Sequence, residues 1–263
     1  MRVAIAQYGP GQDKTANLDI VAGYARRAAE AGADMLICPE AAMVDFGDDK
    51  EKVRQAAEPL DGPFVTGLRK LSAEHGVAVT IGIHETADTD DGRVYNTSVV
   101  ASGGELAAYY RKLHLYDAFS AKESENIVPG VEDPATFRCA GLTVGLVTCY
   151  DLRFPEIFRD LVDRGADLFA VPAAWVRGPF KEAHWLSLLR ARAIENTCYA
   201  IGSGKINDRC IGRSAAYDPM GAQLADLGEV PGMAVVEATA GRLADVREKL
   251  PSLAHRRYRV SLV

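Results

Sequence analysis

The fold is decided by how the chain opens, with Val3-Ala4-Ile5-Ala6-Gln7 and later Asp34-Met35-Leu36-Ile37-Cys38-Pro39. Both are short apolar runs, which indicate buried strands. Residues 17–31, between them, are rich in alanine and carry apolar side chains at helical spacing, so they are predicted to form a helix. A strand, a helix and a strand in this order form a β-α-β unit, which predicts an α/β fold.

The alternation of strands and helices continues toward the C-terminus. Further helices are predicted at residues 64–74, 154–165 and 181–196. Further strands are predicted at residues 77–83, 142–148, 168–172 and 199–203, with hairpins at 94–101 and 106–110 and around 218–221. Hairpins are more frequent than an all-parallel sheet allows. We therefore expect two mixed β-sheets packed face to face with helices outside, a four-layer α-β-β-α sandwich.

Composition bounds the class of protein. The chain has 263 residues, of which 48% are hydrophobic and 25% charged, enough to bury one sizeable core. A net charge of −6 without clustered Lys or Arg argues against nucleic acid as a partner. The first apolar stretch is too short for a signal peptide, and no run approaches the roughly 20 apolar residues of a membrane span. A cytoplasmic location is therefore predicted. The thiols are predicted to be reduced, because the five cysteines are odd in number and lack C-x-x-C spacing.

Glu40 follows the apolar run 34–39, so its carboxylate stands at the end of a buried strand, where active-site residues of α/β folds collect. Burial raises the pKa of a carboxyl and a nearby cation lowers it. A carboxylate held between these effects can act as a general base near neutral pH. The alternative is a strand-end glutamate that pairs with a surface arginine.

Lys112 lies within Tyr109-Tyr110-Arg111-Lys112-Leu113-His114-Leu115, where a strand is expected to end. In a closed site its ammonium can lower the pKa of a cysteine and stabilise an oxyanion. The alternative is a solvated lysine at a strand terminus.

Cys149 ends the strand 142–148 and precedes Pro155, which suits the first turn of the next helix. Such a junction exposes a nucleophile and directs the backbone N–H of Tyr150 toward the oxygen of an attacked carbonyl. Arg153 and Glu156 are expected to brace this turn as an ion pair. The alternative for Cys149 is a buried structural cysteine.

Together these segments resemble the nitrilase superfamily of carbon-nitrogen hydrolases. The motifs occur in the family's order and are Cys38-Pro39-Glu40, Tyr110-Arg111-Lys112-Leu113-His114-Leu115 and Thr148-Cys149-Tyr150-Asp151-Leu152-Arg153-Phe154-Pro155-Glu156. Val171-Pro172-Ala173-Ala174-Trp175 and the segment from His184 to Tyr199 extend the likeness. The resemblance thus covers residues 1–240 as one hydrolase domain, and it leaves 241–263 as a tail expected to pack on the domain or on a partner subunit.

The resemblance implies a Glu-Lys-Cys triad of Glu40, Lys112 and Cys149 on the nitrilase-like sandwich, usually paired in homodimers or larger homo-oligomers. It also implies an auxiliary catalytic glutamate after the lysine motif, and Glu123 matches that position. Cys149 would attack the carbonyl of a small amide while Glu40 accepts the thiol proton. Ammonia and a carboxylic acid would follow through a thioester, without metal or organic cofactor.

Cys149-Tyr150-Asp151 is similar to the amidase branches, whereas nitrile-cleaving relatives typically carry Cys-Trp-Glu. The surrounding residues are similar to those of ω-amidases and deaminated-glutathione amidases, which act on terminal amides of small acids. Tyr116, Trp175 and Arg177 are predicted to line the substrate pocket, and Arg177 could engage a carboxylate or remain an exposed loop arginine. The alternatives are a nitrile or N-carbamoyl hydrolase of the same superfamily and a non-catalytic binding member.

Two other enzyme classes compete. A zinc hydrolase needs convergent ligands, but the histidines show no H-x-x-x-H or similar spacing; they are His75, His84, His114, His184 and His255. A papain-like enzyme would use His114 or His184 as its base and would leave Glu40 and Lys112 without a role.

Overall fold

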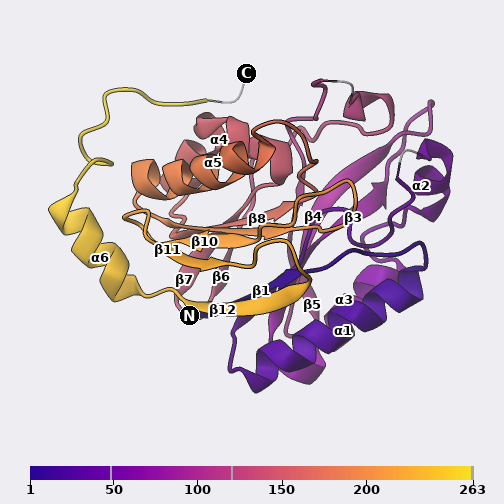
Figure 1. Ribbon diagram of the computed structural model, residues 1–263, viewed down its shortest axis with the longest axis horizontal. Coiled ribbons are helices and arrows are strands. Elements are labelled where there is room, and N and C mark those ends of the chain that lie inside the picture. The colour runs from indigo at the N-terminus through magenta and orange to yellow at the C-terminus, as the bar shows by residue number, and fades with distance from the viewer. Residues whose placement is uncertain (48, 120, 262–263) are drawn as a thin grey trace.

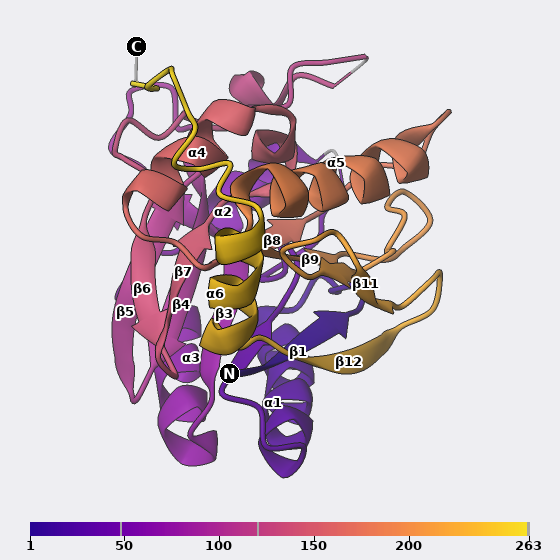
Figure 2. The ribbon, with the colours of Figure 1, turned by 90° about the vertical axis from the view of Figure 1, so that its left-hand side faces the viewer.

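Two six-stranded mixed sheets face each other between layers of helices (Figures 1 and 2). The structure is a computed structural model that describes residues 1–47, 49–119 and 121–261. The first sheet has the strand order β12-β1-β2-β3-β4-β5, and the second has the order β11-β10-β9-β8-β7-β6. In each sheet three central strands are parallel and the outer pairs are antiparallel. The two sheets therefore share one plan.

The twelve strands of the described chain divide equally between the sheets. The first sheet contains β1 (Arg2–Gln7), β2 (Met35–Ile37), β3 (Ala78–Thr86), β4 (Val94–Ser102), β5 (Glu105–Arg111) and β12 (Gly232–Glu237). The second contains β6 (Thr136–Cys139), β7 (Leu142–Leu146), β8 (Leu168–Ala173), β9 (Tyr199–Gly204), β10 (Ala215–Tyr217) and β11 (Gln223–Asp226).

Helices cover the outer faces of both sheets. The six α-helices of the described residues are α1 (Lys14–Glu30), α2 (Lys50–Ala56), α3 (Pro63–His75), α4 (Pro155–Asp163), α5 (Lys181–Asn196) and α6 (Ala240–Lys249). Figure 1 shows α1 and α3 on one side of the paired sheets and α4 and α5 on the other. The described chain also forms two short 3₁₀ helices, η1 (Glu123–Glu125) and η2 (Cys149–Arg153). No helix among the described residues is long and apolar enough to span a membrane.

Strand β1 illustrates why the layers form. Its side chains alternate between two cores, as the period of a strand requires. Val3 and Ile5 join the core that the two sheets enclose, and Ala4 and Ala6 join the core beneath α1 and α3. All four are fully buried, and burial of a side chain such as Ile5 contributes about 1.5–3 kcal/mol.

The predicted four-layer sandwich with two mixed sheets is confirmed. Helix α5 has the predicted bounds, and α1 begins three residues before the predicted start because the Asp13 side chain caps the Ala16 N–H at 2.9 Å. The sequence did not predict β12, which pairs with β1, nor α6, which starts the predicted tail. Arg247 of α6 pairs with Asp167 at 3.1 Å, so this helix packs on the sandwich.

Candidate active site

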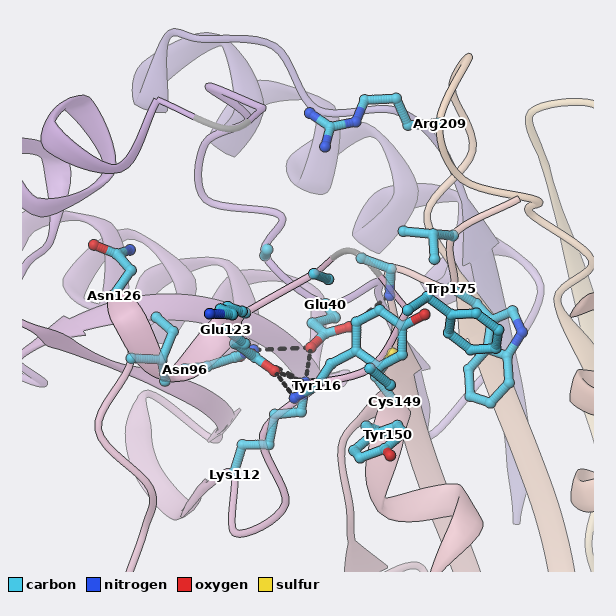
Figure 3. A pocket seen from close by; sticks show the side chains of 18 of the residues that line it. Glu40, Asn96, Lys112, Tyr116, Glu123, Asn126, Cys149, Tyr150, Trp175 and Arg209 are labelled. Carbon is cyan, nitrogen blue, oxygen red and sulfur yellow. Dashed lines mark hydrogen bonds and ion pairs between the residues drawn. The ribbon is translucent and has the colours of Figure 1, made fainter. Parts of the chain in front are cut away.

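The three residues of the predicted triad meet at one edge of the sandwich. Glu40 follows β2, Lys112 follows β5 and Cys149 follows β7, so two come from the first sheet and one from the second. All three line a pocket of about 1010 Å³. Figure 3 shows Glu40 between Lys112 and Cys149, with the side chains of Tyr116, Tyr150 and Trp175 beside the cysteine. The structure thus brings together residues that are 72 and 37 positions apart in sequence.

Glu40 is 3% exposed, and donors from both sheets surround its carboxylate. Its Oε1 accepts hydrogen bonds from Lys112 Nζ at 3.0 Å and from Asn96 Nδ2 at 2.8 Å. Its Oε2 accepts from the backbone N–H of Ala174, after β8, at 2.6 Å. These bonds fix the orientation of the proposed base.

Gly82 in β3 makes room for the Glu40 backbone. The Gly82 N–H donates to Pro39 O at 3.0 Å, and its own C=O accepts from the Ala42 N–H at 2.9 Å. A Cβ on Gly82 would lie 2.7 Å from Glu40 Cα, closer than real Cβ contacts allow. Glycine is therefore required here for close approach of two backbones.

A second carboxylate, Glu123, lies on the other side of the lysine, at the position where the resemblance placed it. Lys112 Nζ donates to its two oxygens at 2.8 and 3.1 Å. Asn96 Nδ2 and the Tyr116 backbone N–H donate to it at 3.0 and 2.6 Å. Asn96 therefore bridges both carboxylates, a role that was not predicted from the sequence.

Cys149 occupies a constrained turn. Its φ is 47°, in the left-handed region that a non-glycine residue rarely adopts. It is the first residue of η2, so the Tyr150 N–H that follows has no acceptor within the helix. This geometry matches the predicted strand, sharp turn and helix.

Asp151 holds this turn in place and is fully buried. Its carboxylate accepts from Thr148 N and Tyr110 Oη, both at 2.8 Å. It also accepts from the backbone N of His114 at 3.1 Å and contacts His114 Nδ1 at 2.7 Å. Because Tyr110 belongs to the first sheet, Asp151 ties the nucleophile turn to the strand that carries Lys112.

The protonation states follow from these contacts. Burial raises the pKa of Glu40, but Lys112, with weaker help from Cys149, Ala174 and Asn96, outweighs burial and holds that pKa below its usual range. Burial, joined by the negative charge of Glu40, raises the pKa of the Cys149 thiol well above its usual value. Burial lowers the pKa of Lys112, but the negative charges of Glu123 and Glu40 outweigh burial and hold that pKa well above its usual value. The resting site therefore holds a thiol, a carboxylate and an ammonium. Lys112 lowers the pKa of the thiol, as predicted, but burial and Glu40 outweigh this effect.

The histidines of the rival Cys-His interpretation have other contacts. His114 is bound to Asp151 and stacks on Phe154 with ring centroids 3.7 Å apart. His184 Nδ1 lies 3.4 Å from Arg153. Neither lines the pocket within the described chain. The described residues also contain no cluster of three or more metal-ligating side chains.

The predicted pocket residues line the same cavity. Tyr116 packs edge-on against Tyr150 with ring centroids 5.1 Å apart, and Trp175 is 3% exposed. Arg177 is exposed, and its Nε donates to Asn207 O at 3.4 Å.

Arg153 does not form the expected brace. Among the ion pairs of the described chain none joins it to Glu156; its guanidinium lies 4.9 Å from the centroid of the Trp175 ring and lines the pocket.

Comparison with known proteins places this site in a family. The family model "Carbon-nitrogen hydrolase" matches residues 2–248, and the chain belongs to that family. It is 38% identical over 258 residues to the deaminated glutathione amidase of Escherichia coli O157:H7, with 98% of each chain covered.

Two solved structures extend the comparison. One is a CN-hydrolase superfamily protein of Xanthomonas campestris with an arsenic adduct in its active site, at 26% identity and a TM-score of 0.88, covering 100% of this chain and 99% of that one. The other is a mutant amidase of Nesterenkonia sp. AN1 with acrylamide added to its active-site cysteine, at 29% identity and a TM-score of 0.77, covering 95% and 98%. The predicted superfamily and amidase class are confirmed.

Proposed function

We propose that this chain hydrolyses a small carboxamide bearing an acidic group, and that Cys149 carries the acyl group as a thioester. The observation that carries the proposal is the placement of a buried thiol beside a carboxylate whose opposite side is held by Lys112. The similarity to an E. coli protein named deaminated glutathione amidase supports an amide of a small acid as substrate.

In the first half-reaction, the Cys149 thiol loses its proton to Glu40 as sulfur attacks the amide carbon. The carbonyl electrons move to oxygen, which the Lys112 ammonium and the Tyr150 N–H stabilise. The tetrahedral intermediate collapses with cleavage of the C–N bond. Glu40 returns the proton to the leaving nitrogen, and ammonia departs.

In the second half-reaction, water attacks the thioester and gives a proton to Glu40. The C–S bond breaks, the acid is released, and the proton returns to Cys149. The sum is amide plus water giving acid plus ammonia. The pKa directions suit these steps, because Glu40 is ionised and Cys149 protonated before attack.

An acidic group on the substrate is supported by the charges of the pocket wall. Arg153, Arg177 and Lys181 line it, and no carboxylate lies within 4.0 Å of any of them among the described ion pairs. A substrate anion would supply the opposite charge.

Ammonia release from a panel of small amides tests the proposal, with neutral amides, ω-monoamides of dicarboxylic acids, nitriles and N-carbamoyl compounds compared. Cys149→Ala is expected to reduce turnover by about a thousandfold or more. Cys198→Ala, at a buried cysteine outside the pocket, is the control. Turnover that survives Cys149→Ala would exclude this nucleophile. Turnover of nitriles alone would exclude the amidase, and no turnover would favour a binding protein.

A further inference from the structure

Lys181 is a buried cation at the pocket wall. It is the first residue of α5 and is 5% exposed, yet it lines the same pocket as Cys149. Its Nζ lies 4.7, 4.6 and 5.5 Å from the ring centroids of Tyr116, Phe119 and Trp175. We call these three rings the aromatic cage.

The hydrogen bonds of Lys181 leave donors unused. An ammonium has three N–H donors, and the one side-chain bond of Nζ among the described residues goes to Tyr116 Oη at 2.7 Å. Other buried lysines of the chain pair with acids: Lys112 with Glu40 and Glu123, and Lys205 with Asp45 at 3.2 Å. In the described part of the chain, no such acid accompanies Lys181.

The position of Lys181 at the start of α5 adds to its unpaired positive charge. The N-terminus of a helix carries a partial positive charge, which disfavours a cation and favours an anion. The contacts with the aromatic cage stabilise a cation. They do not offset the cost of burying an ammonium that no anion accompanies. The cage therefore holds the ammonium in place but leaves its charge unmatched.

We propose that Lys181 binds the remote carboxylate of the substrate and so determines which amides are hydrolysed. The assignment rests on the proposed function, since it supplies the opposite end of the same substrate. Tyr116 connects the two ends: its backbone N–H donates to Glu123 and its phenol accepts from Lys181. The two ends are therefore about one tyrosine side chain apart, a separation that suits a short diacid monoamide.

The test compares two substrates of similar size, glutaramate, which carries a carboxylate, and butyramide, which does not. Lys181→Met is expected to raise KM for glutaramate about tenfold to a hundredfold, the effect of losing one charge-assisted hydrogen bond. Its kcat for glutaramate, and its kcat/KM for butyramide, are expected to stay within about twofold. The control is Lys122→Met, because Lys122 also lines the pocket but has a 73% exposed side chain. Its glutaramate KM should change less than twofold.

An equal loss for both amides would assign Lys181 a structural role and overturn the proposal, as would unchanged glutaramate kinetics. If butyramide is not hydrolysed by the parent protein, the rate at which iodoacetamide alkylates Cys149 replaces it as the uncharged readout. Hydrolysis of butyramide but not glutaramate by the parent protein would also overturn the proposal.

A binding measurement decides the case in which neither amide is hydrolysed. Glutarate is titrated by calorimetry into the Cys149→Ala protein and into the same protein with Lys181→Met. Binding that requires Lys181 would support the anion site even though the proposed amidase had failed. Glutarate that does not bind, or binds both proteins equally, would then overturn the anion site.

Discussion

Replacing His84 with glutamine is expected to remove a specific acid sensitivity of the fold. His84 lies in β3, is 8% exposed, and its Nδ1 has no hydrogen-bond partner among the described residues. Burial, and next the positive charge of Lys205, lower the pKa of His84 from 6.5 to about 4, against the weaker opposite effect of Glu40 and Asp45. Between about pH 4 and pH 6.5 the imidazole is therefore neutral in the folded protein but charged in the unfolded chain.

Proton linkage gives the sign and size of the change in the free energy of unfolding that His84 causes. Because the folded pKa is the lower one, the unfolded chain binds the extra proton, and the free energy of unfolding falls as the pH drops below 6.5. Relative to pH 7, the loss due to this one group is about 2 kcal/mol at pH 5 and about 3 kcal/mol at pH 4. Below that pH both states are protonated and the loss levels off.

Guanidinium unfolding at several pH values between 7 and 4 measures this effect for the parent protein and for His84→Gln. Other titrating groups are common to both proteins, so the difference between their free energies of unfolding isolates His84. That difference should shift by about 2–3 kcal/mol in favour of the variant as the pH falls. A difference that stays constant within about 0.5 kcal/mol would refute the assignment of a neutral, buried imidazole.

Three further predictions concern the catalytic edge. Asp151→Asn should lower the free energy of unfolding by about 2–4 kcal/mol and reduce kcat, because an amide NH₂ then faces buried donors; denaturant midpoints and steady-state rates measure both. Gly82→Ala should reduce kcat/KM about tenfold or more by displacing Glu40. The control Gly23→Ala, which has open space around it in α1, should stabilise the folded protein by about 0.5–1 kcal/mol and leave kcat/KM unchanged. Equal kcat/KM values for both variants would contradict the close approach of the Gly82 and Glu40 backbones. The pH profile of kcat/KM should fall only below the usual pKa of glutamate, about 4.3, because activity is lost as Glu40 is protonated and its pKa is depressed; an acid limb near pH 6 would contradict this.

The sequence predicted features that depend on neighbours in the chain. The position of Cys149 follows from a strand, a turn and a helix in immediate succession, and the sheets follow from the apolar runs. Strand β12 was missed because its partner β1 lies more than 220 residues away and its side chains are only partly buried. Asn96 was missed because its role depends on which strands flank β4, although the polar run Asn96-Thr97-Ser98 inside an apolar strand was a usable signal.

Electrostatics were the least predictable part of the site. The sequence indicated a cation near Cys149, but the balance of burial, Glu40 and Lys112 depends on distances within the folded protein. The unmatched charge of Lys181 likewise depends on its neighbours in the folded protein, Tyr116 in the loop after β5 and Trp175. A single lysine in sequence carries no sign of it.

The hydrogen bonds that cross between the sheets have a consequence for how activity depends on the whole fold. Ala174 holds Glu40, Tyr110 holds Asp151, and the Ser98 and Thr148 hydroxyls meet at 2.9 Å, so each bond joins one sheet to the other at the catalytic edge. The reacting groups are thus aligned only while the sheets are docked. The rate of turnover therefore reports whether the two sheets are docked. In mild denaturant this rate should fall before circular dichroism records any loss of strand or helix.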